Sequence, residues 1–281
     1  MRRCPWVLKI VCRGLAAHAL RRPQPVAPGS TKWFFNCEAL AKIVSNDIIV
    51  QRDFLSEGEE RNLVTELDQY LKMHRYQKSH WDRVITHFRE TERKNWRAVN
   101  RPVINRLREF TFGTLDPCSL PKPVPSADQI LLPLTHVLDL QEEGQIGAHV
   151  DSVRYCGEPI AVISLLSDSV ARFAVAPPEE VVGLPTHLLD LLSLQIPPLG
   201  SWVDIYVPRR SLYVMRGASR YFMTHEIMSN EKVDQLNAEY HADVYKTHRV
   251  RRIAVICRSK NLSELKTLNE PQNAEPKGCT P

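Results

Sequence analysis

The second half of the chain limits the folds available to it more than any other feature. From Gln129 to Arg258, short apolar or alternating runs follow one another, and turn residues separate most of them. The runs are ILL, THVLDL, IGAHV, IAVISLL, WVDIYV, SLYVMR, RYFMTHEI and RRIAVICR. A series of short strands without a helical pattern between them is typical of a β-sandwich, a barrel or a jelly roll. We therefore predict a mostly β fold with flanking helices (α+β) and one of these architectures at its centre.

The flanking helices are predicted upstream of these strands. Ser56 and Glu59 form an S-x-x-E capping box, and apolar residues at helical spacing follow it, which predicts a helix over residues 57–73. A proline near its start and a glycine at its end delimit a second helix over 102–113. Residues 114–129 are rich in proline and are predicted to form an extended loop.

Two segments depart from the strand pattern. Residues 174–200, rich in proline and leucine, have a composition unlike the runs around them and are predicted to be an atypical insert within a domain spanning 46–259. Residues 260–281 are polar and contain three prolines, so we predict a disordered tail there.

The basic charge of the chain is concentrated at its start. Residues 1–37 hold seven of the 37 basic residues and none of the 32 acidic ones, so the remainder carries 30 bases against 32 acids. This slightly acidic body argues against a general polyanion binder. The acid-free, arginine-rich start with an apolar stretch predicts a mitochondrial presequence over 1–37. The alternative is a frayed basic tail.

The cysteines and the hydropathy exclude further classes of protein. The seven cysteines are odd in number and form no CxxC pair, so neither a disulfide framework nor a zinc ribbon is indicated. A reducing compartment such as the cytosol or the mitochondrial matrix fits this usage. Since no window holds 18 uninterrupted apolar residues, we predict no stable membrane insertion.

A possible metal site lies within the strand region. His149 and Asp151 stand two residues apart, and such residues share one face of a strand. One imidazole and one carboxylate supply two members of the facial triad that holds non-haem iron(II) and leaves coordination positions open. His225, in the run RYFMTHEI, is the best candidate for the third ligand. The alternatives are an exposed H-x-D pair that arises by chance and a structural histidine.

The last predicted strand adds two cations. Arg252 and Arg258 are six residues apart, so both fall on one face, which Ala254 and Ile256 share. A buried guanidinium needs an anionic partner, and a small dicarboxylate would suit. The two Cα atoms would lie roughly 20 Å apart, so the two arginines would hold different parts of the ligand. The alternative is two structural ion pairs.

The order of these residues resembles that of AlkB-like dioxygenases, and most of all their mitochondrial members. An H-x-D pair, a later histidine and R-x5-R on the last strand follow the order of that family. The resemblance extends through SHWDRVITHFRETERKNW, THVLDL, IGAHVDSVRYCG, LYVMRGASRYFMTHEI and RRIAVICRS, and covers 46–259 apart from the insert. It implies a double-stranded β-helix (jelly-roll, cupin-like) core. It also implies iron(II) held by His149, Asp151 and His225, with 2-oxoglutarate and O2 as cosubstrates.

The resemblance also assigns the cosubstrate residues. Arg252 would bind the distal carboxylate of 2-oxoglutarate, with the hydroxyl of Tyr213 beside it, and Arg258 would complete the site nearer the iron. The chain departs from the family motif R-x-N-x-T-x-R, because Ala254 and Ile256 replace the asparagine and the threonine. Both replacements remove hydrogen bonds, which predicts weaker binding or an altered pose of 2-oxoglutarate.

Iron(II), 2-oxoglutarate and O2 together imply oxidation of a C–H bond, with release of succinate and CO2. We favour a protein substrate, including the chain itself at Leu138, because charges of both signs surround the aromatics of residues 76–96. RNA demethylation and a non-catalytic barrel that keeps a metal are the alternatives. The resemblance further implies the mitochondrial matrix, fatty acid metabolism and regulated necrosis. The sequence does not define the oligomeric state.

Overall fold

The computed structural model describes residues 33–115, 126–181, 196–239 and 246–261. The helices are α1 (Glu38–Asp47), α2 (Glu57–Leu71), α3 (Arg101–Gly113), α4 (Ala127–Ile130), α5 (Gly217–Tyr221) and α6 (Asn230–Glu239). The strands are β1 (Trp33–Phe35), β2 (Ile48–Gln51), β3 (Gln77–Ser79), β4 (Ile85–Arg93), β5 (Thr135–His149), β6 (Ile160–Leu165), β7 (Ser169–Val175), β8 (Trp202–Val207), β9 (Leu212–Met215), β10 (Met223–Ile227) and β11 (Arg252–Arg258).

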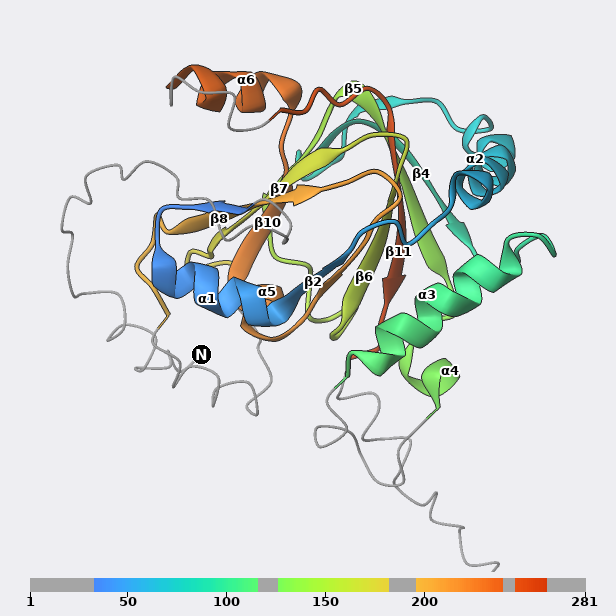
Figure 1. Ribbon diagram of the computed structural model, residues 1–281, viewed down its shortest axis with the longest axis horizontal. Helices are drawn as coiled ribbons and strands as arrows, with labels where there is room; N and C mark the ends of the chain where they lie inside the picture. Colours follow the sequence, from blue (N-terminus) through green and yellow to red (C-terminus); the bar gives the residue numbers. More distant parts are fainter. Residues whose placement is uncertain (1–32, 116–125, 182–195, 240–245, 262–281) are drawn as a thin grey trace, which may run out of the picture.

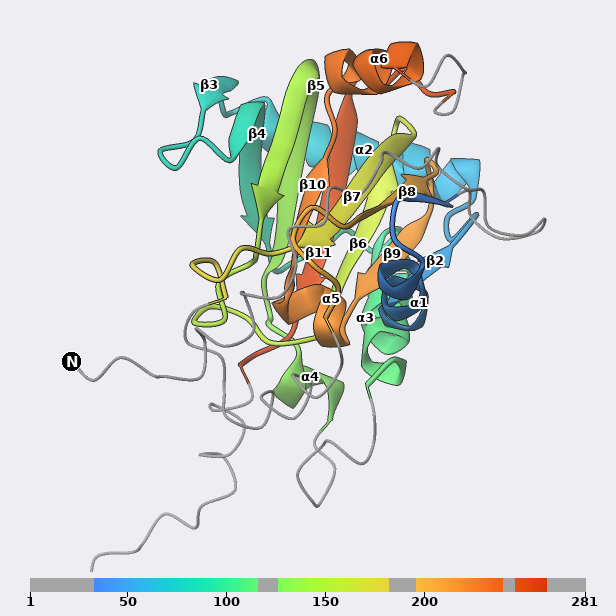
Figure 2. The ribbon, with the colours of Figure 1, turned by 90° about the vertical axis from the view of Figure 1, so that its left-hand side faces the viewer.

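The strands form one curled antiparallel sheet with the order β1-β8-β7-β10-β5-β11-β6-β9-β2, and β4 pairs with both β5 and β3. Strand β5 joins the two layers of this sheet. Its first part pairs with β11 and its last part pairs with β10. Figures 1 and 2 show the two layers facing each other across a common interior. The predicted mostly β fold with flanking helices and a double-stranded β-helix core is thus confirmed.

A sharp bend in β5 brings its two ends together. In the pairing with β4, Leu140 and Gln145 lie opposite Phe88 and Thr86, so the intervening residues bulge out of the ladder. Figure 1 shows β5 turning at the top of the view. The bend is tight at Gly144, where an added Cβ would lie 2.9 Å from a backbone oxygen of β4. The sequence predicted two separate runs here, whereas the structure has one continuous bent strand.

A buried arginine fixes this bend. Arg249 is 2% exposed, and its guanidinium donates hydrogen bonds to the carbonyl oxygens of Gln141 (2.8 Å) and Gly144. An extended strand of this length would span about 50 Å. Yet one side chain, Arg258, contacts both His136 near the start of β5 and Asp151 just beyond its end. The bend therefore makes a shared site possible.

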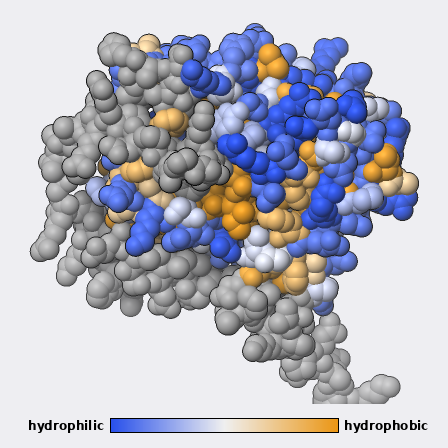
Figure 3. Space-filling view, in the orientation of Figure 1, coloured by the Kyte–Doolittle hydropathy of each residue, from blue (hydrophilic) through white to orange (hydrophobic). Residues whose placement is uncertain are grey.

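Two hydrophobic cores lie on the two faces of the β11 layer. The inner core fills the space between the layers and includes Leu138, Leu140 and Ala254. The outer core lies under α2 and α3, and includes Val137 and Ile253. Figure 1 shows both helices together on one side of the sheet. This alternation confirms that one face of the last strand points inward, as its sequence predicted. On the face seen in Figure 3, hydrophobic side chains gather between α1 and α3.

Several local predictions are confirmed. Ser56 caps α2 and forms the complete capping box with Glu59. This helix ends at Leu71, slightly before the predicted residue 73. Helix α3 has its proline in the first turn and ends at Gly113, as predicted.

Other local predictions were wrong. Part of the predicted loop 114–129 belongs to α4, where Ser126 and Gln129 form a second capping box. Helices α5 and α6 interrupt the strand series that the sequence presented as free of helices. Helix α5 has only five residues, and α6 buries only Val233 among its described residues. Neither helix therefore shows a periodic pattern of apolar residues in the sequence.

Two predicted segments share residues with strands of the sheet. Trp33–Phe35, inside the predicted presequence range, form β1 and pair with β8. The first two residues of the predicted insert, Ala174 and Val175, belong to β7, and the remainder connects β7 to β8. Residues 1–32, 182–195 and 262–281 lie outside the described residues, and so does most of what was predicted for them. Within the described part of the chain, every helix is too short or too polar to cross a membrane.

Candidate metal centre

Three of the predicted site residues meet at one end of the sheet interior. His149 is the last residue of β5, and His225 lies directly opposite it in the middle of β10. Asp151 lies two residues after His149. It stands just beyond the end of β5, whereas the sequence predicted it on the same strand. One ligand atom of each of these three side chains lies within 4.8 Å of the others. Among the described residues, no other set of three acidic, histidine or cysteine side chains comes as close.

Hydrogen bonds select the nitrogen of His149 that faces this centre. Its Nδ1 donates to the carbonyl oxygen of Gly147 at 2.9 Å, which leaves Nε2 for the centre, 3.4 Å from Oδ1 of Asp151. A backbone carbonyl that fixes the tautomer in this way is common behind metal-binding histidines. The ring centroids of His149 and His225 are 4.3 Å apart. Two imidazoles and one carboxylate on one side of a site form the donor set of non-haem iron(II).

The surroundings of the centre favour the metal-binding forms of Asp151 and His225. Burial would raise the pKa of Asp151, but the Arg258 guanidinium and the two histidines hold that pKa well below its usual range, so the carboxylate is ionised. Burial and the neighbouring His149 lower the pKa of His225 to about 3, so its imidazole is neutral. Burial is the largest single influence on His149 and lowers its pKa, but the hydrogen bond and the charge of Asp151, together with the Gly147 carbonyl, outweigh burial and raise the pKa of His149.

A buried arginine that sequence reasoning missed holds the loop carrying Asp151. Arg220, in α5, is fully buried. Its guanidinium donates to the carbonyl oxygens of Asp151 (2.8 Å), Cys156 (3.0 Å) and Gly157 (3.1 Å). The sequence placed Arg220 in a strand together with His225. Arg220 opens the mixed run RYFMTHEI, in which no local pattern marks it as buried.

Arg258 lies at the same end of the interior as the three candidate ligands. Its Nε is 3.5 Å from Oδ2 of Asp151. Its Nη1 is 3.1 Å from Nδ1 of His136, and Nε2 of His136 is 2.9 Å from Glu90. The sequence gave no role to either His136 or Glu90.

Arg252 lies at the other end of β11 and is 1% exposed. Its Nε donates to the hydroxyl oxygen of Ser164 at 3.0 Å, and the guanidinium also hydrogen-bonds the hydroxyl of Tyr213. Burial lowers the pKa of Arg252, and its Nη2 is buried without a hydrogen-bond partner among the described residues. An unpartnered buried guanidinium nitrogen beside a tyrosine hydroxyl fits the carboxylate of a ligand.

The wall between the two arginines is apolar. Ala254 and Ile256 on β11 and Leu138 and Leu140 on β5 all belong to the inner core. Where the family motif has an asparagine and a threonine, this chain offers hydrocarbon surface. A diacid with a methylene centre matches a cation at each end and apolar walls between them. The six predicted residues therefore lie in one interior, with the three candidate metal ligands at one end and Arg252 and Tyr213 at the other.

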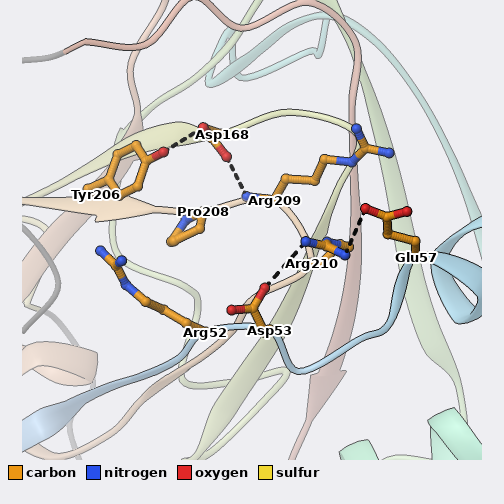
Figure 4. A pocket seen from close by; sticks show the side chains of 8 residues that line it. All are labelled: Arg52, Asp53, Glu57, Asp168, Tyr206, Pro208, Arg209 and Arg210. Atoms are coloured by element: carbon orange, nitrogen blue, oxygen red, sulfur yellow. Dashed lines mark hydrogen bonds and ion pairs between the residues drawn. The ribbon is translucent and has the colours of Figure 1, made fainter.

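A cavity of about 370 Å³ elsewhere contains none of these residues. It lies where β8 leads into β9 and where β2 leads into α2 (Figure 4). Its charges largely pair with one another: Arg210 contacts Asp53 (3.4 Å) and Glu57 (3.6 Å), and Asp168 accepts from the hydroxyl of Tyr206 (2.5 Å). Because these groups satisfy one another, the cavity gives no sign of the predicted chemistry.

Two mammalian proteins are similar to this chain over about three quarters of its length. The bovine (Bos taurus) alpha-ketoglutarate-dependent dioxygenase alkB homolog 7, mitochondrial, is 36% identical over 211 residues, which cover 75% of this chain and 77% of that protein. The mouse (Mus musculus) protein of the same name is 36% identical over 217 residues, covering 76% of this chain and 79% of its own length. No protein-family model matches the chain.

Solved structures with a similar outline are more distant. OsALKBH1 has a TM-score of 0.43 and 13% identity, and the match covers 75% of this chain and 97% of that one. A prolyl hydroxylase from Trichoplax adhaerens, in complex with a hypoxia inducible factor peptide fragment, has a TM-score of 0.46 and 7% identity, with coverage of 83% and 91%. The two mammalian relatives carry the assignment: this chain belongs to the AlkB-like family of alpha-ketoglutarate-dependent dioxygenases, which use iron(II) and 2-oxoglutarate.

Proposed function

We propose that this chain is a mitochondrial dioxygenase that hydroxylates protein side chains. The observation that carries the proposal is the convergence of His149, Asp151 and His225 in the same interior as Arg252, a buried arginine that pairs with no acidic side chain in the described part of the chain. Bound iron(II), with 2-oxoglutarate and O2, supplies the oxidation of a C–H bond coupled to loss of CO2 and formation of succinate.

The chain's own residues perform the binding and the orientation. His149, Asp151 and His225 would hold the metal on one side and leave its other side open to ligands. Arg252 and Tyr213 would hold the distal carboxylate of 2-oxoglutarate. Arg258 would stabilise the ionised Asp151 and place positive charge at the metal end of the cosubstrate.

The aromatic segment over residues 76–96 supports protein over nucleic acid as the substrate. A flipped base needs aromatic surfaces that are free to stack. Phe88 is fully buried, Arg89 lies over the Tyr76 ring at 4.3 Å, and Trp96 packs against the outer core. Trp81 is 86% exposed, but the His80 ring is tilted against it at 47° with the centroids 5.4 Å apart, so the two rings do not form parallel surfaces for a base.

Leu138 is the proposed site of self-hydroxylation. It is 1% exposed, and its side chain belongs to the inner core between the two arginines. Incubation with iron(II), 2-oxoglutarate and O2 should add one oxygen to the peptide that contains Leu138, and mass spectrometry would detect it. An unchanged peptide after succinate has formed would remove Leu138 as a target and leave the enzyme intact.

Localisation in the matrix is part of the proposal. Both mammalian relatives are named as mitochondrial, and residues 1–37 have the composition of a presequence. Imaging the chain with and without these residues tests this. Mitochondrial signal that persists after the deletion would contradict it.

The central test compares succinate formation by the native chain and by His149→Ala. We expect turnover to be abolished in a variant that still folds, since the substitution removes one metal ligand at the end of a strand. A variant that still forms succinate would refute the proposed centre, and a native chain that forms none would favour the non-catalytic barrel. Affinity for RNA that falls steeply with added salt would favour the demethylase alternative.

A further inference from the structure

We infer that His136, anchored by Glu90, is a positioning residue that sets the orientation of Arg258 at the 2-oxoglutarate site. This inference rests on the proposed function and deepens it. Sequence reasoning gave His136 no role, and the family motif on the last strand does not include it.

The contacts form one line from β4 to the metal centre. Oε2 of Glu90 is 2.9 Å from Nε2 of His136. Nδ1 of His136 is 3.1 Å from Nη1 of Arg258. Nε of Arg258 is 3.5 Å from Oδ2 of Asp151. Three strands therefore supply successive members of this line, and its last member is a candidate metal ligand.

The direction of each hydrogen bond follows from the chemistry of the groups. A guanidinium can only donate, so Nδ1 of His136 must accept the bond from Arg258. A neutral imidazole that accepts at Nδ1 carries its proton on Nε2, and this proton is donated to Glu90. The carboxylate of Glu90 therefore selects the tautomer whose lone pair faces Arg258. This is the arrangement by which a second group commonly fixes the tautomer of a functional histidine.

The hydrogen bond to His136 also keeps Arg258 from turning fully onto Asp151. Arg258 is a long side chain at the end of β11, and its contact with Asp151 is 3.5 Å, longer than a close ion pair. Without an acceptor at His136, the guanidinium could pair with the Asp151 carboxylate through two nitrogens. It would then present its charge to the carboxylate and less to 2-oxoglutarate.

Two amide substitutions separate the role of each imidazole nitrogen. Asparagine carries its amide oxygen as many bonds from Cα as Nδ1, so His136→Asn keeps an acceptor for Arg258. Glutamine carries its polar atoms at the distance of Nε2, so His136→Gln keeps a partner for Glu90 and removes the acceptor. We expect His136→Gln to raise the KM for 2-oxoglutarate by about tenfold, with a smaller change in kcat. His136→Asn should remain within about twofold of the native KM.

Direct binding gives a readout independent of turnover. 2-Oxoglutarate is titrated calorimetrically into the full chain loaded with Mn(II) under nitrogen, where the dissociation constant should follow the same order. Glu90→Leu keeps the imidazole but removes its anchor, and should weaken binding by about threefold. It provides a second test if His136→Gln does not fold.

His248→Gln is the matched control. Nε2 of His248 is 3.0 Å from Glu142, but this pair is exposed and belongs to no part of the site. Its dissociation constant should equal the native value. Native binding together with equal constants for His136→Gln and His136→Asn would overturn the inference and leave the proposed function standing. A native chain that does not bind 2-oxoglutarate would overturn both.

Discussion

Two consecutive arginines face opposite sides of the same sheet and have opposite surroundings. On the outer side, Arg251 donates to Asp139 at 2.8 and 2.7 Å and to Asp68 of α2 at 2.7 Å. These bonds raise the pKa of Arg251 despite its partial burial. On the inner side, Arg252 hydrogen-bonds only to hydroxyl groups among the described residues, and burial lowers its pKa.

The difference separates a structural cation from a candidate ligand-binding one. Asp139 is fully buried and also accepts hydrogen bonds from Arg89 and Tyr76, so the outer cluster is complete within the protein and ties α2 to the sheet. Among the residues that the structure describes, the inner arginine has one nitrogen without a hydrogen-bond partner and no acidic side chain paired with it. A buried cation of this kind is stabilised only when an anion arrives.

Breaking the outer cluster should have the largest effect on stability. Asp139→Ala leaves two guanidiniums without their shared acceptor, and should lower the free energy of unfolding by about 3–5 kcal/mol. Urea denaturation measures this loss. The dissociation constant for 2-oxoglutarate of the folded protein should change little. A loss below about 1 kcal/mol would show that the outer cluster is not structural.

Removing the inner arginine should have the opposite profile. Arg252→Met keeps the length of the side chain but loses the charge, and should raise the dissociation constant for 2-oxoglutarate at least about 100-fold. The free energy of unfolding without ligand should stay the same or increase, because a buried charge without an acid is removed. Calorimetric titration and urea denaturation measure the two quantities. Destabilisation as large as that of Asp139→Ala would erase the distinction between the two arginines.

The ligand itself should sharpen the contrast. 2-Oxoglutarate at 100 times its dissociation constant should stabilise the metal-loaded native chain by about 2.7 kcal/mol, because it binds only the folded form. Thermal unfolding with and without 2-oxoglutarate measures this shift. The shift should persist in Arg251→Met, and it should disappear in Arg252→Met. Loss of the shift in Arg251→Met would place the outer arginine in the binding site.

The smallest expected effect concerns the apolar wall between the arginines. Ile256→Thr restores a hydroxyl that the family motif has at this position, and should tighten 2-oxoglutarate binding by about three- to fivefold. Titration of the metal-loaded variant measures the change. Ile256→Val, which shortens the side chain without adding a hydroxyl, is the control. Equal affinity in both variants would show that the lost hydroxyl does not explain the departure from the motif.

Local patterns predicted the candidate metal and cosubstrate residues, and missed the residues that hydrogen-bond to them. Alternation along 252–258 placed both arginines on one face, and the H-x-D pair marked its own site. Arg220 and His136 could not be predicted in the same way, because their partners are backbone carbonyls or side chains on strands far away in the sequence. Helix α5, which carries Arg220, is five residues long and has no periodic signal.

The sequence by itself determined which side chains face inward, where α2 and α3 begin, and which residue types could form a metal centre. These properties depend on neighbours within a few positions, through alternation, capping and composition. Only the tertiary structure decided that β5 bends and that Arg258 reaches both His136 and Asp151. Only the tertiary structure places His225 opposite His149, because a segment of unusual composition separates the two residues in the sequence. Contacts between distant segments depend on how the layers pack as a whole, and no local pattern encodes that packing.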